Sequence, residues 1–240
     1  LEGFDAGQLA LAPDLYVVGN VVTRGNALME ALLDAGAAYT SGPQWLAEHV
    51  LAGRHVLAVA GTHGKTTTTS LTASVLGEGG LDPTFVIGGQ LLAAGANARL
   101  GSGDWLAAEA DESDGSFLRL NPQIAVVTNI DADHLENYGG DFARVQAAFS
   151  EFLHRLPFYG LAVLCIDHPR VQAMLARIDR RHVTYGTNPQ ADYVASDITH
   201  EGISTGFQVR RRGESLGRFE VRVPGIHNVL NCLATIAVAS

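Results

Sequence analysis

Short apolar runs recur along this chain, and stretches with helical periodicity separate most of them. The run at 56–60, Val-Leu-Ala-Val-Ala, is typical of a strand buried on both faces. Further runs predict strands at 84–87, 104–110, 124–128, 161–166 and 182–185. Helical patterns lie over 65–76, 141–153 and 169–178. This alternation predicts an α/β fold with a mostly parallel sheet and helices on both faces.

Toward the end of the chain the pattern changes to an alternation of apolar and polar residues. It covers 206–210 and 217–223, which predicts an antiparallel hairpin at the edge of the sheet with one face in solvent. A last helix is predicted over 226–239, directly after a Pro-Gly pair.

The first part of the chain has a shorter β-α-β-α rhythm. It predicts a strand at 14–20, a helix at 26–33, a minimal strand at 38–40 and a second helix from Gly42. We interpret it as part of a smaller, Rossmann-like α/β domain whose beginning lies outside this chain. The predicted organisation is therefore a domain at 1–53 and a larger one at 54–240.

Composition narrows the class of protein. Apolar residues make up 47% of the 240 positions and charged residues 17%, which predicts a large core and no disordered character. A net charge of −9 argues against a nucleic-acid partner, since binding phosphates over a broad face needs clustered Lys and Arg. Both cysteines, Cys165 and Cys232, lie in apolar runs, which fits a reducing, cytoplasmic setting. We find no run of membrane-spanning length and expect no membrane partner; the oligomeric state stays open.

A Gly-rich turn follows the first strong strand and leads into a helix. Such a turn leaves backbone N–H groups directed outward at a helix N-terminus, which makes an anion site. Lys65 can reach the outer phosphates of a nucleotide, and the Thr66 hydroxyl can ligate its Mg²⁺. Val59 stands where the common P-loop pattern has its first glycine. The alternative is a plain strand-to-helix turn. The predicted loop comprises Gly61, Thr62, His63, Gly64, Lys65, Thr66 and Thr67.

Polar clusters follow two later strands of the predicted sheet. Residues 109–114, Glu-Ala-Asp-Glu-Ser-Asp, and 129–134, Asn-Ile-Asp-Ala-Asp-His, begin where strands end. Ligands of open α/β sheets bind beyond the carboxyl ends of the strands, so both clusters should lie near the loop. Glu109 is placed to hold Mg²⁺, and His134 is a candidate metal or phosphate ligand. For the other acids of the first cluster, a solvated loop is an equal alternative.

A third cluster opens the last helix. His227 and Asn228 are followed by Asn231, and the two amides are three residues apart and share one helix face. They could hydrogen-bond the edge of a purine. The alternative is that Asn228 only caps the helix.

Together, the loop at 61–67, the clusters at 109–114 and 129–134, and the His-Asn-x-x-Asn motif resemble the Mur ligases. The resemblance implies a three-domain, ATP-dependent enzyme of peptidoglycan assembly. Such an enzyme phosphorylates a UDP-sugar carboxylate, and an amine then attacks the acyl phosphate. It further implies that Thr66 and Glu109 ligate one Mg²⁺ and His134 a second. Lys65, Glu109 and His134 would serve catalysis, with His227, Asn228 and Asn231 at the nucleotide.

Two branches of the family are represented. From about residue 83 onward, segments such as 109–117 and 156–160 resemble UDP-N-acetylmuramate–L-alanine ligase. Upstream, segments such as 1–5 and 41–49 resemble the ligase that recycles a murein tripeptide. By this resemblance 1–53 is the C-terminal part of the UDP-sugar-binding domain. We take L-alanine ligation to UDP-N-acetylmuramate as the predicted function, because the central domain carries the reaction; ligation of the tripeptide L-alanyl-γ-D-glutamyl-meso-diaminopimelate is the alternative.

Two further classes remain open. A P-loop kinase or plain NTPase would use the same loop but transfer phosphate to a hydroxyl or to water. A non-catalytic nucleotide-binding fragment would bind without turnover. Because the C-terminal domain of the family is not matched in this chain, we expect weak ATP binding at best and no ligation by the chain alone.

Overall fold

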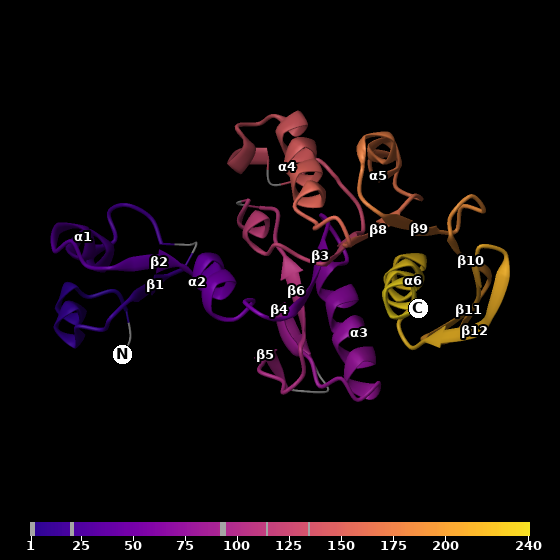
Figure 1. The fold of residues 1–240 in the computed structure, drawn as a ribbon, viewed down its shortest axis with the longest axis horizontal. Helices are drawn as coiled ribbons and strands as arrows, with labels where there is room; N and C mark the ends of the chain where they lie inside the picture. Colours follow the sequence, from indigo (N-terminus) through magenta and orange to yellow (C-terminus); the bar gives the residue numbers. More distant parts are fainter. Residues whose placement is uncertain (1–2, 20–21, 92–94, 114, 134) are drawn as a thin grey trace. The chain divides into compact units, whose positions relative to one another are not determined.

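The computed structural model describes residues 3–19, 22–91, 95–113, 115–133 and 135–240. His134, one of the predicted metal ligands, lies outside these residues. The chain divides into two compact units, Leu1–Ala52 and Gly53–Ser240, whose placement relative to one another is not determined (Figure 1). No helix of the described part is long and apolar enough to cross a membrane.

The first unit has the predicted β-α-β-α order. Its two strands pair in parallel, with Tyr16 opposite Tyr39. Asn26 caps the first helix by accepting hydrogen bonds from the amides of Leu28 and Met29. A 3-10 helix that the sequence pattern did not predict precedes these elements. The elements are η1 (Ala6–Leu11), β1 (Tyr16–Val18), α1 (Ala27–Asp34), β2 (Tyr39–Ser41) and α2 (Gly42–His49).

The second unit is built on one ten-stranded sheet in the order β12-β11-β10-β9-β8-β7-β3-β6-β4-β5. All neighbours from β10 to β4 pair in parallel, whereas β5, β11 and β12 are antiparallel to the strands beside them. The mostly parallel sheet and the antiparallel edge hairpin are therefore confirmed. The strands are β3 (His55–Ala60), β4 (Thr84–Leu91), β5 (Ala96–Arg99), β6 (Trp105–Ala110), β7 (Ile124–Val127), β8 (Leu161–Cys165), β9 (His182–Gly186), β10 (Tyr193–Glu201), β11 (Ser204–Arg211) and β12 (Glu214–Val221).

Helices cover both faces of this sheet, as predicted (Figure 1). Helices α3 and α6 lie on one side, and α4 and α5 lie on the other. Because both faces are covered, 57–60 of β3 are fully buried, as the unbroken apolar run predicted. The helices are α3 (Lys65–Glu78), α4 (Phe142–His154), α5 (Pro169–Met174) and α6 (Ile226–Ala239), with 3-10 turns η2 (Ser116–Arg119), η3 (Leu135–Tyr138) and η4 (Leu175–Arg177).

Strands β5 and β10 were missed in the sequence, and β4 is longer than predicted. The register of β4 and β5 shifts between Val86 and Leu91, which lets β4 continue past the Gly-Gly pair that was expected to end it. Strand β10 is polar over much of its length, and its register shifts between Ser196 and Thr199. These strands are held by pairing with neighbours, so they carry little apolar alternation of their own.

Candidate nucleotide site

The predicted phosphate loop connects β3 to α3. Gly61 and Gly64 have φ angles of +137° and +84°, which only glycine adopts readily. A Cβ atom on Gly61 would lie 2.0 Å from the Thr128 hydroxyl oxygen, and one on Gly64 would lie 2.5 Å from Asn231 Oδ1. The N-cap of α3 is Gly64, which has no side chain with which to cap the helix. Amides at a helix N-terminus can bind an anion, so this geometry fits the predicted phosphate loop, whose role stays a prediction.

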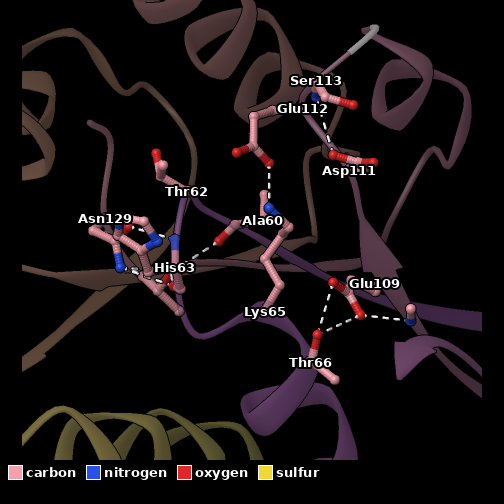
Figure 2. Close-up of polar contacts among 12 residues, drawn as sticks. Ala60, Thr62, His63, Lys65, Thr66, Glu109, Asp111, Glu112, Ser113 and Asn129 are labelled. Atoms are coloured by element: carbon pink, nitrogen blue, oxygen red, sulfur yellow. Dashed lines mark hydrogen bonds and ion pairs between the residues drawn. The ribbon is translucent and has the colours of Figure 1, made fainter. Parts of the chain in front are cut away.

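Lys65 makes a buried ion pair with the loop that follows β6. Its Nζ lies 2.7 Å from Glu112 Oε2, and the two side chains are 12% and 4% exposed (Figure 2). The Tyr138 hydroxyl donates a hydrogen bond to the main-chain carbonyl of Glu112. Sequence reasoning left Glu112 undecided between solvent and the site. Its position three residues after Glu109, at a strand end beside the loop, was the only signal for it.

The end of strand β6 itself brings a carboxylate to Thr66. The Thr66 hydroxyl lies 3.0 and 3.1 Å from the two carboxylate oxygens of Glu109, and the Gly88 amide donates to Glu109 Oε2 at 2.7 Å (Figure 2). A hydroxyl and a carboxylate are hard oxygen ligands of the kind that Mg²⁺ takes together with phosphates and water. The described residues contain no group of three or more His, Cys, Asp or Glu that could hold a metal. The Thr66 hydroxyl and the Glu109 carboxylate fit a Mg²⁺ ion that takes its remaining ligands from phosphates and water.

On the other side of β3, uncharged groups of the segment that follows β7 make hydrogen bonds to the phosphate loop. Thr128 and Asn129 both bond the main chain of His63, and the Thr62 amide donates to the Asn129 carbonyl. The amide of Asp131 donates to the Thr62 hydroxyl at 2.8 Å. The 129–134 cluster is thus beside the loop, as expected, but its described contacts are mainly with the loop backbone.

Two histidines flank the carboxylate of Asp131. His168 Nε2 lies 3.2 Å from Oδ1, and His63 Nε2 lies 3.8 Å from Oδ2. His168 was not a candidate from the sequence. It stands at the N-cap of α5, just after β8, so the strand-end rule that selected Glu109 also pointed to this position.

A cleft of about 320 Å³ lies beside the loop, bounded by His63, Asn129 and the start of α6. Asn231 and His227 line it. Asn228 is not among its lining residues: its Nδ2 donates to the Pro224 carbonyl at 2.7 Å, and its Oδ1 lies 3.4 Å from Asn231 Nδ2. The N-cap of α6 is Gly225, with no side-chain cap. Asn228 is therefore neither the cap that was the alternative nor a lining residue of the cleft; it accepts a hydrogen bond from Asn231 instead.

The far wall of the cleft is uncharged at neutral pH. Cys165 and Tyr185 form it. Burial raises the pKa of the Cys165 thiol to about 11 and the pKa of the Tyr185 phenol well above its ordinary value. Both cysteines of the chain are free. Such a wall suits the neutral, flat part of a ligand.

The structure brings the predicted residues together at two places. Lys65, Thr66 and Glu109 converge at the start of α3, while His63, Gly64, His227 and Asn231 border the cleft. The catalytic, nucleotide and metal roles assigned to the predicted residues, including Thr67 and His134, stay predictions.

A buried parallel strand, a Gly-Lys-Thr turn and a neighbouring carboxylate together define a P-loop nucleotide-binding protein of the α/β class. Residues 59–239 match the Mur ligase middle domain, and the chain belongs to the Mur ligase family.

Two relatives with similar sequences are L-alanine ligases of this family. The chain is 68% identical over 185 residues to the UDP-N-acetylmuramate–L-alanine ligase of Stenotrophomonas maltophilia (strain K279a), covering 77% of this chain and 39% of that protein. It is 57% identical over 226 residues to the enzyme of the same name from Sorangium cellulosum (strain So ce56), covering 94% and 48%. The chain thus spans less than half of these relatives.

A solved structure from the other branch matches the whole chain. The crystal structure of UDP-N-acetylmuramate:L-alanyl-gamma-D-glutamyl-meso-diaminopimelate ligase from Neisseria meningitides superposes with a TM-score of 0.91 at 36% identity, covering 100% of this chain and 78% of that one.

Proposed function

We propose that this chain is the nucleotide-binding part of an ATP-dependent ligase that joins L-alanine to UDP-N-acetylmuramate. The observation that carries the proposal is the convergence of Lys65, Thr66 and Glu109 at the start of α3. It occurs in a chain 68% identical over 185 residues to a ligase of that name. Residues 1–53 would then be the C-terminal part of the domain that binds the UDP-sugar.

The proposed reaction requires two anions, a sugar carboxylate and a terminal phosphate, to approach each other. Cationic groups must offset their repulsion, and preorganised ones do so without reorganising during the step. Lys65 is such a group, because Glu112 holds its ammonium inside the protein at the phosphate loop. When nucleotide binds, Lys65 would turn one of its N–H donors to the phosphates while Glu112 keeps another.

Mg²⁺, when bound, would neutralise phosphate charge and polarise the transferred group. Thr66 and Glu109 are the residues that would hold it, and both carboxylate oxygens of Glu109 lie within 3.1 Å of the Thr66 hydroxyl. The Gly88 amide donates a hydrogen bond to Glu109 Oε2 and so holds the carboxylate in this orientation. His134 is proposed as ligand to a second ion on the resemblance alone.

The purine is proposed to occupy the cleft between the phosphate loop and α6. Asn231 can present its amide to a base edge, and Asn228 holds that amide in place. The uncharged wall formed by Cys165 and Tyr185 would contact the flat part of the base.

A separate observation favours the tripeptide as the acceptor. The tripeptide-adding ligase from Neisseria meningitides covers 100% of this chain, including the first unit. If the first unit governs the choice, the acceptor is a tripeptide rather than L-alanine.

A hybrid enzyme separates these possibilities. The matching 226-residue segment of the Sorangium cellulosum ligase, which takes in 94% of this chain and therefore most of the first unit, would be replaced by that of this chain. We expect ADP and an amide product only when UDP-N-acetylmuramate and L-alanine are both present. Product formed only with the tripeptide would favour the second acceptor. A phosphorylated alcohol, or ATP hydrolysis without either substrate, would contradict ligation.

A further inference from the structure

The phosphate loop of this chain connects strand β3, which ends at Ala60, to helix α3, which begins at Lys65. Most peptide groups between them take no part in the hydrogen bonds of the sheet or the helix, so another part of the chain has to supply partners for them.

The side chain of Asn129 does this for the central peptide groups of the loop. Its Oδ1 accepts a hydrogen bond from the His63 amide at 2.8 Å, and its Nδ2 donates to the His63 carbonyl at 2.8 Å (Figure 2). A carboxamide bonded to both the N–H and the C=O of one residue can face only one way. The arrangement copies a hydrogen-bonded pair of an antiparallel sheet, with a side chain in place of the second strand.

Two consequences follow for the anion site. The His63 N–H is committed to Asn129, so the amides at the start of α3 are the ones left for phosphates. The Thr128 hydroxyl also donates to the His63 carbonyl, at 2.7 Å, so this carbonyl is held from two sides.

We propose that Asn129 is a positioning residue of the phosphate loop. Its carboxamide fixes the His63 peptide and thereby aims the start of α3 and Lys65 at the phosphates. Its Nδ2 also donates to the Thr128 hydroxyl at 3.2 Å, so both N–H donors of the carboxamide are used within these two segments. Only the second half of the test below rests on the proposed nucleotide function.

The first half is done without nucleotide, by amide hydrogen exchange in the 240-residue chain. Asn129→Leu removes both bonds at similar volume, and we expect the His63 amide to exchange at least about tenfold faster. Asn129→Asp keeps an acceptor for that amide, so its protection should persist. Asn26→Leu is the matched control, because it also removes two side-chain bonds to backbone amides, in the other unit. Unchanged His63 exchange in Asn129→Leu would overturn the proposal. If that variant does not fold, fast exchange in Asn129→Asp would do so.

The second half compares two ligands by calorimetry. Asn129→Leu should weaken the binding of ADP with Mg²⁺ about tenfold and leave adenosine binding unchanged, because the loop serves the phosphates. Asn26→Leu should change neither. An equal loss for adenosine would mean that Asn129 contacts the base, and the proposal would be wrong. If the unaltered chain binds neither ligand, its nucleotide function fails, while hydrogen exchange still decides the role of Asn129.

Discussion

The phosphate loop lies between two neighbouring strand ends that support it in different ways. Strand β6 is on one side of β3 and β7 is on the other. The end of β6 and the loop after it offer carboxylates to the side chains of Thr66 and Lys65. The loop after β7 offers a hydroxyl and an amide to the main chain of His63. One neighbour thus sets the charge of the site, and the other sets its shape.

The division has an electrostatic reason. A carboxylate bonded to the loop backbone would place negative charge where phosphates must bind, at low local dielectric. A neutral amide holds the same backbone without that repulsion. Carboxylates are useful only where a cation stands between them and the phosphates, as Lys65 or a Mg²⁺ ion does. Altering one side at a time should therefore have separable effects.

The largest effect is expected from Lys65→Met. It removes the cation and leaves Glu112, whose side chain is 4% exposed, as a buried carboxylate without its partner. We expect a loss of about 3–5 kcal/mol in the free energy of unfolding, together with loss of ADP binding. Urea unfolding can be followed by Trp105 fluorescence in a Trp45→Phe background.

The double variant Lys65→Met/Glu112→Leu is the control for this prediction. It should recover most of the stability, because no charge is left buried, but it should not recover ADP binding. Wild-type stability in the single variant would show that Glu112 is not held by Lys65 in solution.

A smaller and more selective effect is expected from Glu109→Gln. Its amide still accepts from Thr66, so stability should change by less than about 1 kcal/mol. The charge that attracts Mg²⁺ is lost, and ADP affinity in the presence of Mg²⁺ should fall about tenfold while affinity without Mg²⁺ stays the same. Calorimetry with and without EDTA measures both. Glu201→Gln, an exposed carboxylate at the end of β10, serves as control. An equal loss without the metal would assign Glu109 to the nucleotide itself.

On the β7 side, Thr128→Val should cost about 1 kcal/mol of stability. It removes the hydroxyl that donates to the His63 carbonyl but keeps the shape of the side chain. Thr68→Val is matched to it, since the buried Thr68 hydroxyl has no hydrogen-bond partner in the part of the chain that the structure describes, and this change should be neutral or stabilising. Urea midpoints of the two variants provide the measurement. Equal midpoints would show that the hydrogen bond from the Thr128 hydroxyl does not stabilise the fold.

The last prediction requires no substitution and concerns the alkylation of Cys165 in the uncharged wall of the cleft. The pKa of Cys165 is raised from 9.0 to about 11, so at pH 8 the thiolate is about a hundredfold scarcer than for an ordinary cysteine. Iodoacetamide should therefore alkylate Cys165 at least about a hundredfold more slowly than a free thiol, until urea unfolds the chain. Peptide mass spectrometry reports the rate. Fast labelling in the folded state would show that the wall is polar and open.

Much of the sheet could be predicted because apolar runs such as 56–60 have a local cause, burial on both faces. Helix α6 matched its predicted bounds, 226–239, because its buried residues give the sequence a local helical pattern. Strands β5 and β10 escaped because they depend on pairing rather than on a pattern of their own. Among site residues, Lys65, Thr66 and Glu109 follow from motif and strand-end position. Glu112 and His168 also follow strand ends, but only the structure showed which side chains they contact, Lys65 for Glu112 and Asp131 for His168.

By itself, the sequence determined the strand, the glycine turn and the helix that make the phosphate loop. These are set by hydrophobic period and by the φ angles that glycine alone tolerates, both of which are local. Only the tertiary structure decided what surrounds the loop. Lys65 meets Glu112 from 47 positions away, and His63 meets Asn129 from 66. Those contacts exist because β6 and β7 are the neighbours of β3, and the order of strands in a sheet is a property of the whole fold.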